Sequence, residues 1–238
     1  MSTPLSALEV QARYHLGAPA ATDTYWSSAE LIAAANLACH DLWRSVSDLR
    51  GLHIATLDVT NVSLAANATS LTGVPADCVR VHMLEPRDLS SSGSSRGLKF
   101  TPRPYNSPEF QSARAQDATD PSNGEIFWVQ MGAGGPVVAP TVLVAPSVTS
   151  AVLLSLTYVP VLADLTAASA NPIPGESDNA VIAWMVAYAR AKERDDRAPD
   201  PSWLTVYATE KQNLLVSLSP RQDQEPMVAT AYFQEYWS

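Results

Sequence analysis

The sequence predicts an α+β protein in which helices from both ends of the chain form a bundle that carries a β-rich insertion. Two observations indicate this fold. Apolar residues recur with helical spacing near both ends, whereas the intervening stretch of about 120 residues holds short strand-like runs. The chain also has 18 prolines and 10 glycines, which suit a loop-rich β region, as one sheet or as a sandwich, better than an all-helical protein.

Four segments are expected along the chain. Residues 1–51 would supply the N-terminal helices of the bundle, and residues 52–172 the β-rich insertion. Residues 173–219 would supply the C-terminal helices, and residues 220–238 an extended aromatic tail.

Two helices are predicted in the first segment. Weakly spaced apolar residues from Leu5 to Leu16 indicate a short helix, and Gly17 is a plausible stop. The second helix is better marked, because Ser27 and Glu30 have the spacing of a capping box, in which each side chain binds a backbone N–H of the first turn. Its apolar face holds Leu31, Ala35, Ala38, Leu42 and Leu49, and Gly51 would end it.

The period then changes towards two, which is typical of strands. The predicted strands are a strand–turn–strand stretch from Ile54 to Leu64, then Cys78–Leu84, Ile126–Met131, Val142–Val144 and Ala151–Val159. Residues 90–97 and 102–108 are predicted to be exposed loops, because they are rich in Ser and Gly or in Pro. Gly132 to Gly135 indicate a turn rather than a phosphate-binding loop, because Pro136 follows where such a loop needs a helix.

Two more helices are predicted near the C-terminus. Ser177 is the expected N-cap of the first, and Asp178 suits the positive end of its dipole. Asp200 followed by Pro201 is a strong start signal for the second helix, because proline fits the first helical turn.

Composition excludes several classes of function. The formal net charge is -9, and no block of Lys and Arg is present to neutralise DNA phosphates. Cys39 and Cys78 give no disulfide framework and favour synthesis in a cytosol. The N-terminus does not resemble a signal peptide, and the apolar runs are too short to span a membrane. No histidine pair has zinc-ligand spacing and no serine lies in a nucleophile elbow, so we expect no catalytic residue, metal or cofactor.

The residues from Ala231 to Ser238 form the most suggestive surface in the sequence. Four aromatic residues in so short a segment are unlike a disordered tail, which is normally poor in them. Each could bury roughly 150–250 Å² on a partner. The expected partner is either a second type of protein or a neighbouring subunit, and the alternative is that the segment folds back onto its own bundle. The contact residues would be Tyr232, Phe233, Tyr236 and Trp237.

A run of charges of both signs follows the third predicted helix. A solvated helix end is the ordinary interpretation, and salt bridges between subunits are the alternative. The residues concerned are Arg190, Glu193, Arg194, Asp195, Asp196 and Arg197.

Short pieces of the sequence occur in a recognisable order: Trp26-Ser27-Ser28-Ala29-Glu30-Leu31 with Asn36, Val74-Pro75-Ala76-Asp77, Val142-Leu143-Val144-Ala145-Pro146, Leu156-Thr157-Tyr158, and Ile173-Pro174 before an Ala-rich helix that ends in Glu193-Arg194-Asp195. In this order and α–β–α setting the chain resembles the head-to-tail adaptor proteins of tailed bacteriophages.

That resemblance implies a structural virion protein of the phage neck, made in the host bacterial cytoplasm. It implies a ring, of twelve copies, that joins the portal protein to a tail, nozzle or tail-terminator protein and continues the DNA channel. Double-stranded DNA would pass through without specific binding. Another neck or tail component, such as a tail-completion protein, and a β-rich binding module are the alternatives. A glycosidase-like cleft with two carboxylates in the β region is the weakest one.

Overall fold

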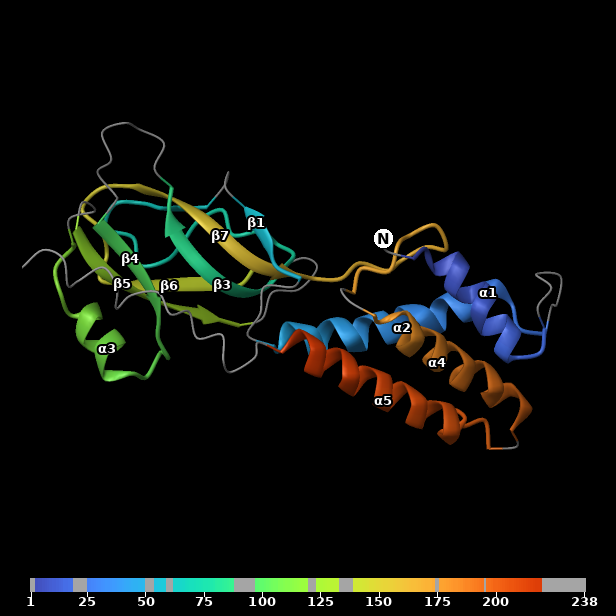
Figure 1. Cartoon of the computed structure of the whole chain (residues 1–238). Helices are drawn as coiled ribbons and strands as arrows, with labels where there is room; N and C mark the ends of the chain where they lie inside the picture. The colour runs from blue at the N-terminus through green and yellow to red at the C-terminus, as the bar shows by residue number, and fades with distance from the viewer. Residues whose placement is uncertain are drawn as a thin grey trace, which may run out of the picture. The chain divides into compact units, whose positions relative to one another are not determined.

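The computed structural model describes residues 3–18, 25–49, 54–58, 62–87, 97–119, 123–132, 139–173, 176–194 and 196–219. The chain divides into two compact units, shown with their elements in Figure 1. Residues 1–53 and 164–238 form the helical unit, and residues 54–163 form the β unit. Within the described residues the fold is α+β, as predicted, with five α-helices and two small sheets.

The helical unit is built around one buried helix. It contains α1 (Leu5–His15), α2 (Ser28–Ser47), α4 (Asp178–Ala189), the short 3-10 helix η1 (Arg190–Glu193) and α5 (Pro201–Leu218). Helix α4 contacts α1, α2 and α5, and it is apolar on nearly all sides, as expected of a helix with neighbours around it. Helices from both ends of the chain therefore pack together in this unit.

The start of α2 confirms the predicted capping box. Ser27 Oγ accepts a hydrogen bond from the Glu30 N–H at 3.3 Å, and Glu30 Oε2 accepts from the Ser27 N–H at 3.0 Å. Gly17, with a φ of +72°, follows α1 as predicted. Helix α2 is shorter than expected, because it ends at Ser47 with Asp48 as its C-cap, and Gly51 lies outside the described residues.

The other two predicted N-cap residues differ in whether the side chain makes a capping hydrogen bond. Asp200 caps α5 as predicted, since its side chain accepts from the Ser202 N–H at 2.9 Å. Ser177 is the N-cap residue of α4 as predicted, but its side chain makes no capping hydrogen bond. The hydroxyl instead donates to the Ile173 carbonyl at 3.3 Å and accepts from Asn171 Nδ2 at 2.9 Å, because both groups are buried beside it.

The chain between Asp164 and Ile173 lies against the start of α1. The backbone N–H groups of Leu5 and Ser6 donate to the carbonyls of Ser169 and Ala167, each at 2.9 Å. Asn171, which is 4% exposed, accepts from the Ile173 N–H and donates to both Ser177 and Asp178. This one buried amide thereby fixes the entry into α4.

The β unit contains two sheets. The first is antiparallel and centres on β7 (Val152–Pro160), which pairs with β1 (Thr56–Asp58), β2 (Ser63–Leu64) and β3 (Cys78–Pro86). In the second sheet β5 (Asn123–Met131) lies between β4 (Gly97–Pro102), to which it is parallel, and β6 (Thr141–Ala145), to which it is antiparallel. Figure 1 shows β7 as a long strand of the unit.

The two sheets share one hydrophobic core. Alternating side chains of β5, β6 and β7 point into it, as period-two strands require. In β3 every third residue is buried there, because its pairing with β7 has two register shifts. The core residues are Val62, Leu64, Leu71, Cys78, Val81, Leu84, Leu98, Ile126, Trp128, Val142, Val144, Val148, Val152, Leu154, Leu156 and Tyr158. The strands predicted from Cys78, Ile126, Val142 and Ala151 are confirmed to within a few residues.

The predicted proline-rich loop at 102–108 is only partly correct. Pro102 ends β4, and Pro108 begins α3 (Pro108–Arg114), whose N-cap Ser107 accepts from the Phe110 N–H at 3.2 Å. The helix forms because Phe110 is fully buried in a small core with Ala113 and Ala145, to which partly buried residues of β5 and β6 add. The predicted Ser/Gly loop lies outside the described residues except for Gly97, which begins β4.

Candidate functional site

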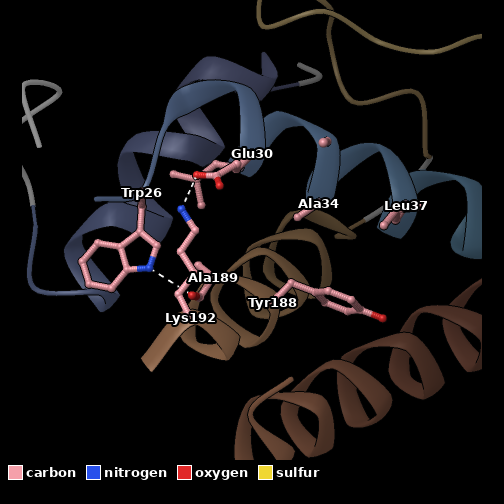
Figure 2. Close-up of a pocket in the computed structure, with 9 residues that line it drawn as sticks. Trp26, Glu30, Ala34, Leu37, Tyr188, Ala189 and Lys192 are labelled. Atoms are coloured by element: carbon pink, nitrogen blue, oxygen red, sulfur yellow. Dashed lines mark hydrogen bonds and ion pairs between the residues drawn. The ribbon is translucent and has the colours of Figure 1, made fainter. Parts of the chain in front are cut away.

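A hollow of about 280 Å³ lies on the helical unit between α2 and the end of α4, and we call it the α2–α4 groove (Figure 2). Small side chains of α2 and α4 leave this space, because an alanine cannot fill the gap between two helices. The lining residues are Trp26, Glu30, Leu31, Ala33, Ala34, Leu37, Tyr188, Ala189 and Lys192.

Trp26 closes one end of the groove. Its indole Nε1 donates to the Ala189 carbonyl at 3.0 Å, which joins the start of α2 to the end of α4. The ring is 7% exposed, and Tyr25 packs edge-on against it with ring centroids 4.8 Å apart. Ala189 is also the N-cap of η1, so this hydrogen bond holds Trp26 at the junction of α4 and η1.

An ion pair stands beside Trp26 at the same end of the groove. Lys192 Nζ donates to Glu30 Oε2 at 2.6 Å and to the Tyr25 carbonyl at 2.8 Å. The hydrogen bond from Lys192, followed by those from Ser27, lowers the pKa of Glu30 to about 2. This end is therefore polar and charged at neutral pH, and Figure 2 shows Glu30 and Lys192 facing each other there.

The other end of the groove is apolar and open to solvent. Leu37 is 54% exposed and Tyr188 is 37% exposed, although large apolar side chains are normally covered. Figure 2 shows both at the end away from Trp26. The α2–α4 groove is thus an apolar trough with one charged end, which suits a peptide segment with aromatic side chains.

Tyr188 belongs to a cluster of three packed aromatic rings from α4 and α5. Trp184 stacks on Tyr188 with centroids 4.8 Å apart and meets Tyr207 edge-on at 4.6 Å. The Tyr207 hydroxyl donates to Asp41 of α2, which also accepts from Lys211 Nζ at 2.6 Å. Burial raises the pKa of Asp41, but these hydrogen bonds outweigh it and hold the pKa below its ordinary value.

A smaller hollow of about 240 Å³ lies on the β unit. It is lined by Pro102 and the two residues after it, and by Trp128, Val129 and Gln130 of β5. Trp128 Nε1 is buried and has no hydrogen-bond partner among the described residues. The hollow is apolar, and within the described part of the chain no group of three His, Cys, Asp or Glu residues is placed to hold a metal ion.

The two cysteines are not activated as nucleophiles. Burial is the main cause that raises the pKa of both thiols to about 12, with smaller contributions from Asp178 for Cys39 and from Asp77 for Cys78. Each thiol is therefore protonated at neutral pH and packs as a small apolar group.

The predicted charged run lies at η1 and the loop after it. Arg190 donates to the His15 carbonyl at 3.1 Å and pairs with Asp200 at 3.5 Å, and Arg194 forms a two-bond pair with Asp196 at 3.0–3.1 Å. Glu193 and Arg197 are exposed and form no ion pair with another described residue. Asp195 lies outside the described residues.

The predicted aromatic contact residues Tyr232, Phe233, Tyr236 and Trp237 also lie outside the described residues. The α2–α4 groove was not predicted, because its two walls are some 150 residues apart in the sequence. A sequence signal for it does exist in the exposed face of α2, where Ala33 and Leu37 interrupt the expected polar residues.

Two residues of the short sequence pieces identified above, Asn36 and Asp77, bind the backbone or side chains of distant segments. Asn36 binds both backbone groups of Leu165, accepting from its N–H at 2.7 Å and donating to its carbonyl at 2.9 Å. Asp77 accepts from the Tyr158 hydroxyl at 3.3 Å and, through its carbonyl, from the Val161 N–H at 2.7 Å. These residues therefore hold loops to helices and strands.

Comparison with known families gives one match across most of the chain. A family model described as "SU10 adaptor protein" matches residues 3–231, which cover the whole β unit and most of the helical unit. No curated protein matches the chain. Among the described residues, no helix is both long and apolar enough to cross a membrane.

Proposed function

We propose that this chain, which belongs to the SU10 adaptor protein family, is the head-to-tail adaptor of a tailed bacteriophage. The family match over residues 3–231 is the observation that carries the proposal. The family is one of phage head-to-tail adaptors, so the chain is a phage adaptor protein. A structural role without catalysis is part of the proposal, and the family supports it.

In this proposal twelve copies form a ring that docks beneath the portal, and the helical unit is the bundle that makes the ring wall. A ring of identical copies needs two different faces that fit each other, because each contact is head-to-tail. Exposed apolar side chains on two different helices support such an arrangement. Val10 and Tyr14 of α1 are 48% and 67% exposed, and Val206 and Val216 of α5 are 43% and 65% exposed.

The β unit would face the tail, nozzle or tail-terminator protein. Its hollow beside Trp128 offers a contact for that partner. The proposal keeps the four segments predicted from the sequence, which are residues 1–51, 52–172, 173–219 and 220–238.

DNA would pass through the ring without specific binding. The chain carries a net charge of -9 and has no cluster of Lys and Arg, so a channel built from it would repel phosphates rather than hold them. Such a channel favours the passage of DNA when it leaves the head.

Two sets of residues would make the contacts between components. Tyr232, Phe233, Tyr236 and Trp237 would bind the portal or a neighbouring subunit. Of the charged run at 190–197, Glu193 and Arg197 are the strongest candidates for salt bridges between subunits, because Arg190, Arg194 and Asp196 already have partners within the chain. Asp195 belongs to the same candidate set.

Sedimentation tests the proposal. The purified chain is mixed with the portal protein of the same phage genome and, separately, with the tail-tube protein, and each mixture is centrifuged. We expect a complex with the portal that sediments faster than the portal alone. Binding to the tail tube and not to the portal would make the chain a tail component instead.

A further inference from the structure

The end of α5 lies within reach of the α2–α4 groove. Lys211 of α5 binds Asp41 of α2, and Leu218 lies seven residues beyond Lys211, while Leu37 lies one turn before Asp41. At 1.5 Å per residue the two distances along the helices add up to roughly 17 Å. Figure 1 shows α5 running alongside α2 to the same end of the helical unit.

The chain after α5 has a suitable length to cover that distance. The described residues end at Ser219, and residues 220–231 then separate α5 from Tyr232. Twelve residues of any chain span at most about 40 Å, and a random coil of twelve residues has an end-to-end distance of about 20 Å. The two lengths match, which is the condition for the highest effective concentration of a tethered segment, on the order of millimolar.

The groove and the segment also match in chemistry. The groove presents alanines, Leu37 and the face of Tyr188, and it ends at the Glu30–Lys192 pair. The segment offers four aromatic side chains, with Gln234 and Glu235 between them. Aromatic rings can cover the apolar floor while a tyrosine hydroxyl or Glu235 meets the charged end.

We propose that in the free subunit the segment Tyr232–Trp237 lies in the α2–α4 groove of its own chain. The portal or a neighbouring subunit then has to displace it, so a free subunit keeps its aromatic contact residues covered until assembly. The docking itself does not depend on the adaptor role, whereas the displacement step rests on the proposed function.

Photo-crosslinking of the full chain tests this docking. Phe233 is replaced by p-benzoylphenylalanine, the protein is irradiated while monomeric, and the products are mapped by mass spectrometry. We expect crosslinks from position 233 to residues 33–37 and 188–192 within one chain, at a yield that does not change over a hundredfold dilution.

Two matched variants provide the control. Leu37→Glu places a charge on the apolar floor and should reduce these crosslinks at least fivefold. Leu153→Glu makes the same change on β7, where the side chain is 45% exposed and belongs to the other unit, and should leave the yield unchanged. Circular dichroism of both variants checks that they are folded.

Three results would overturn the proposal. The first is crosslinking of position 233 outside the groove or to no defined site, and the second is an equal yield in the two variants. The third is covalent dimers whose yield rises with concentration, which would place the segment on a second copy. Absence of portal binding in the sedimentation experiment would overturn the adaptor proposal and leave the docking result standing.

Discussion

Trp26 shows how one side chain joins the two ends of the chain. Its indole N–H satisfies the Ala189 carbonyl, which is 163 residues away in the sequence. The donor and the acceptor are buried, so removal of the donor takes away one buried hydrogen bond between the start of α2 and the end of α4.

Trp26→Phe should therefore lower the free energy of unfolding of the helical unit by about 0.5–1.5 kcal/mol beyond the loss of packing. Hydrogen exchange of α2 and α4 peptides measures this for the helical unit separately. Trp184→Phe is the matched control, because Trp184 Nε1 has no hydrogen-bond partner among the described residues. An equal loss in the two variants would show that the hydrogen bond contributes nothing.

Glu30 should make stability depend on pH in a defined window. Its pKa falls from 4.5 to about 2 on folding, so above pH 4.5 the carboxylate contributes its full stabilisation. Between pH 4.5 and 2 the unfolded chain takes up the proton first, and the contribution is lost.

The difference in urea midpoint between the native chain and Glu30→Gln should therefore be largest above pH 4.5 and shrink as the pH falls to 2. Lys192→Gln should remove most of the same pH dependence, because the hydrogen bond from Lys192 is the largest cause of the shift. A difference that stays constant from pH 7 to pH 2 would contradict this account of the pair.

At the scale of elements, β7 is the central strand of the first sheet of the β unit. It pairs with three other strands, and Leu154 and Leu156 on one face lie in the shared core at 1% and 0% exposure. Leu153, which points to the opposite face as strand periodicity requires, is 45% exposed.

Leu154→Ala should lower the stability of the β unit by about 2–5 kcal/mol, because it leaves a cavity in the core. Leu153→Ala, the same change at the adjacent residue, should cost less than about 1 kcal/mol. Hydrogen exchange of β3 and β7 peptides measures both. Similar losses in the two variants would mean that the strand register is wrong.

Local signals explain which elements the sequence could predict. The capping box at Ser27 and the Asp200-Pro201 start depend on residues within one helical turn, and both were found. Ser177 is the N-cap of α4 as predicted, but its hydroxyl binds Asn171 of the preceding segment and no backbone N–H of the helix. Helix α3 was missed, because it lasts seven residues and is stabilised by burial of Phe110 rather than by a periodic pattern.

The site depends on contacts that a sequence does not reveal. The α2–α4 groove joins Trp26 and Leu37 to Tyr188 and Lys192, and no periodicity links these regions. The family that the sequence suggested is confirmed by the family match over residues 3–231. Two residues of the pieces that suggested it, Asn36 and Asp77, hold loops in place in the structure.

At the scale of the whole molecule, the aromatic tail should be needed for assembly and not for folding. Deletion of residues 232–238 removes a segment beyond the family match and beyond every described contact. We expect the circular dichroism spectrum to stay unchanged and the affinity for the portal to fall at least tenfold. A truncated chain that binds the portal as well as the full chain would show that the four aromatic residues have no part in the contact.

Electron microscopy of the chain mixed with the portal protein of its own phage tests the adaptor account most directly. The account predicts a ring stacked on the portal, with the symmetry of the portal and with the helical units in its wall. Free portal particles beside unassembled chains, under conditions in which the chain binds a tail tube or another ligand, would contradict it.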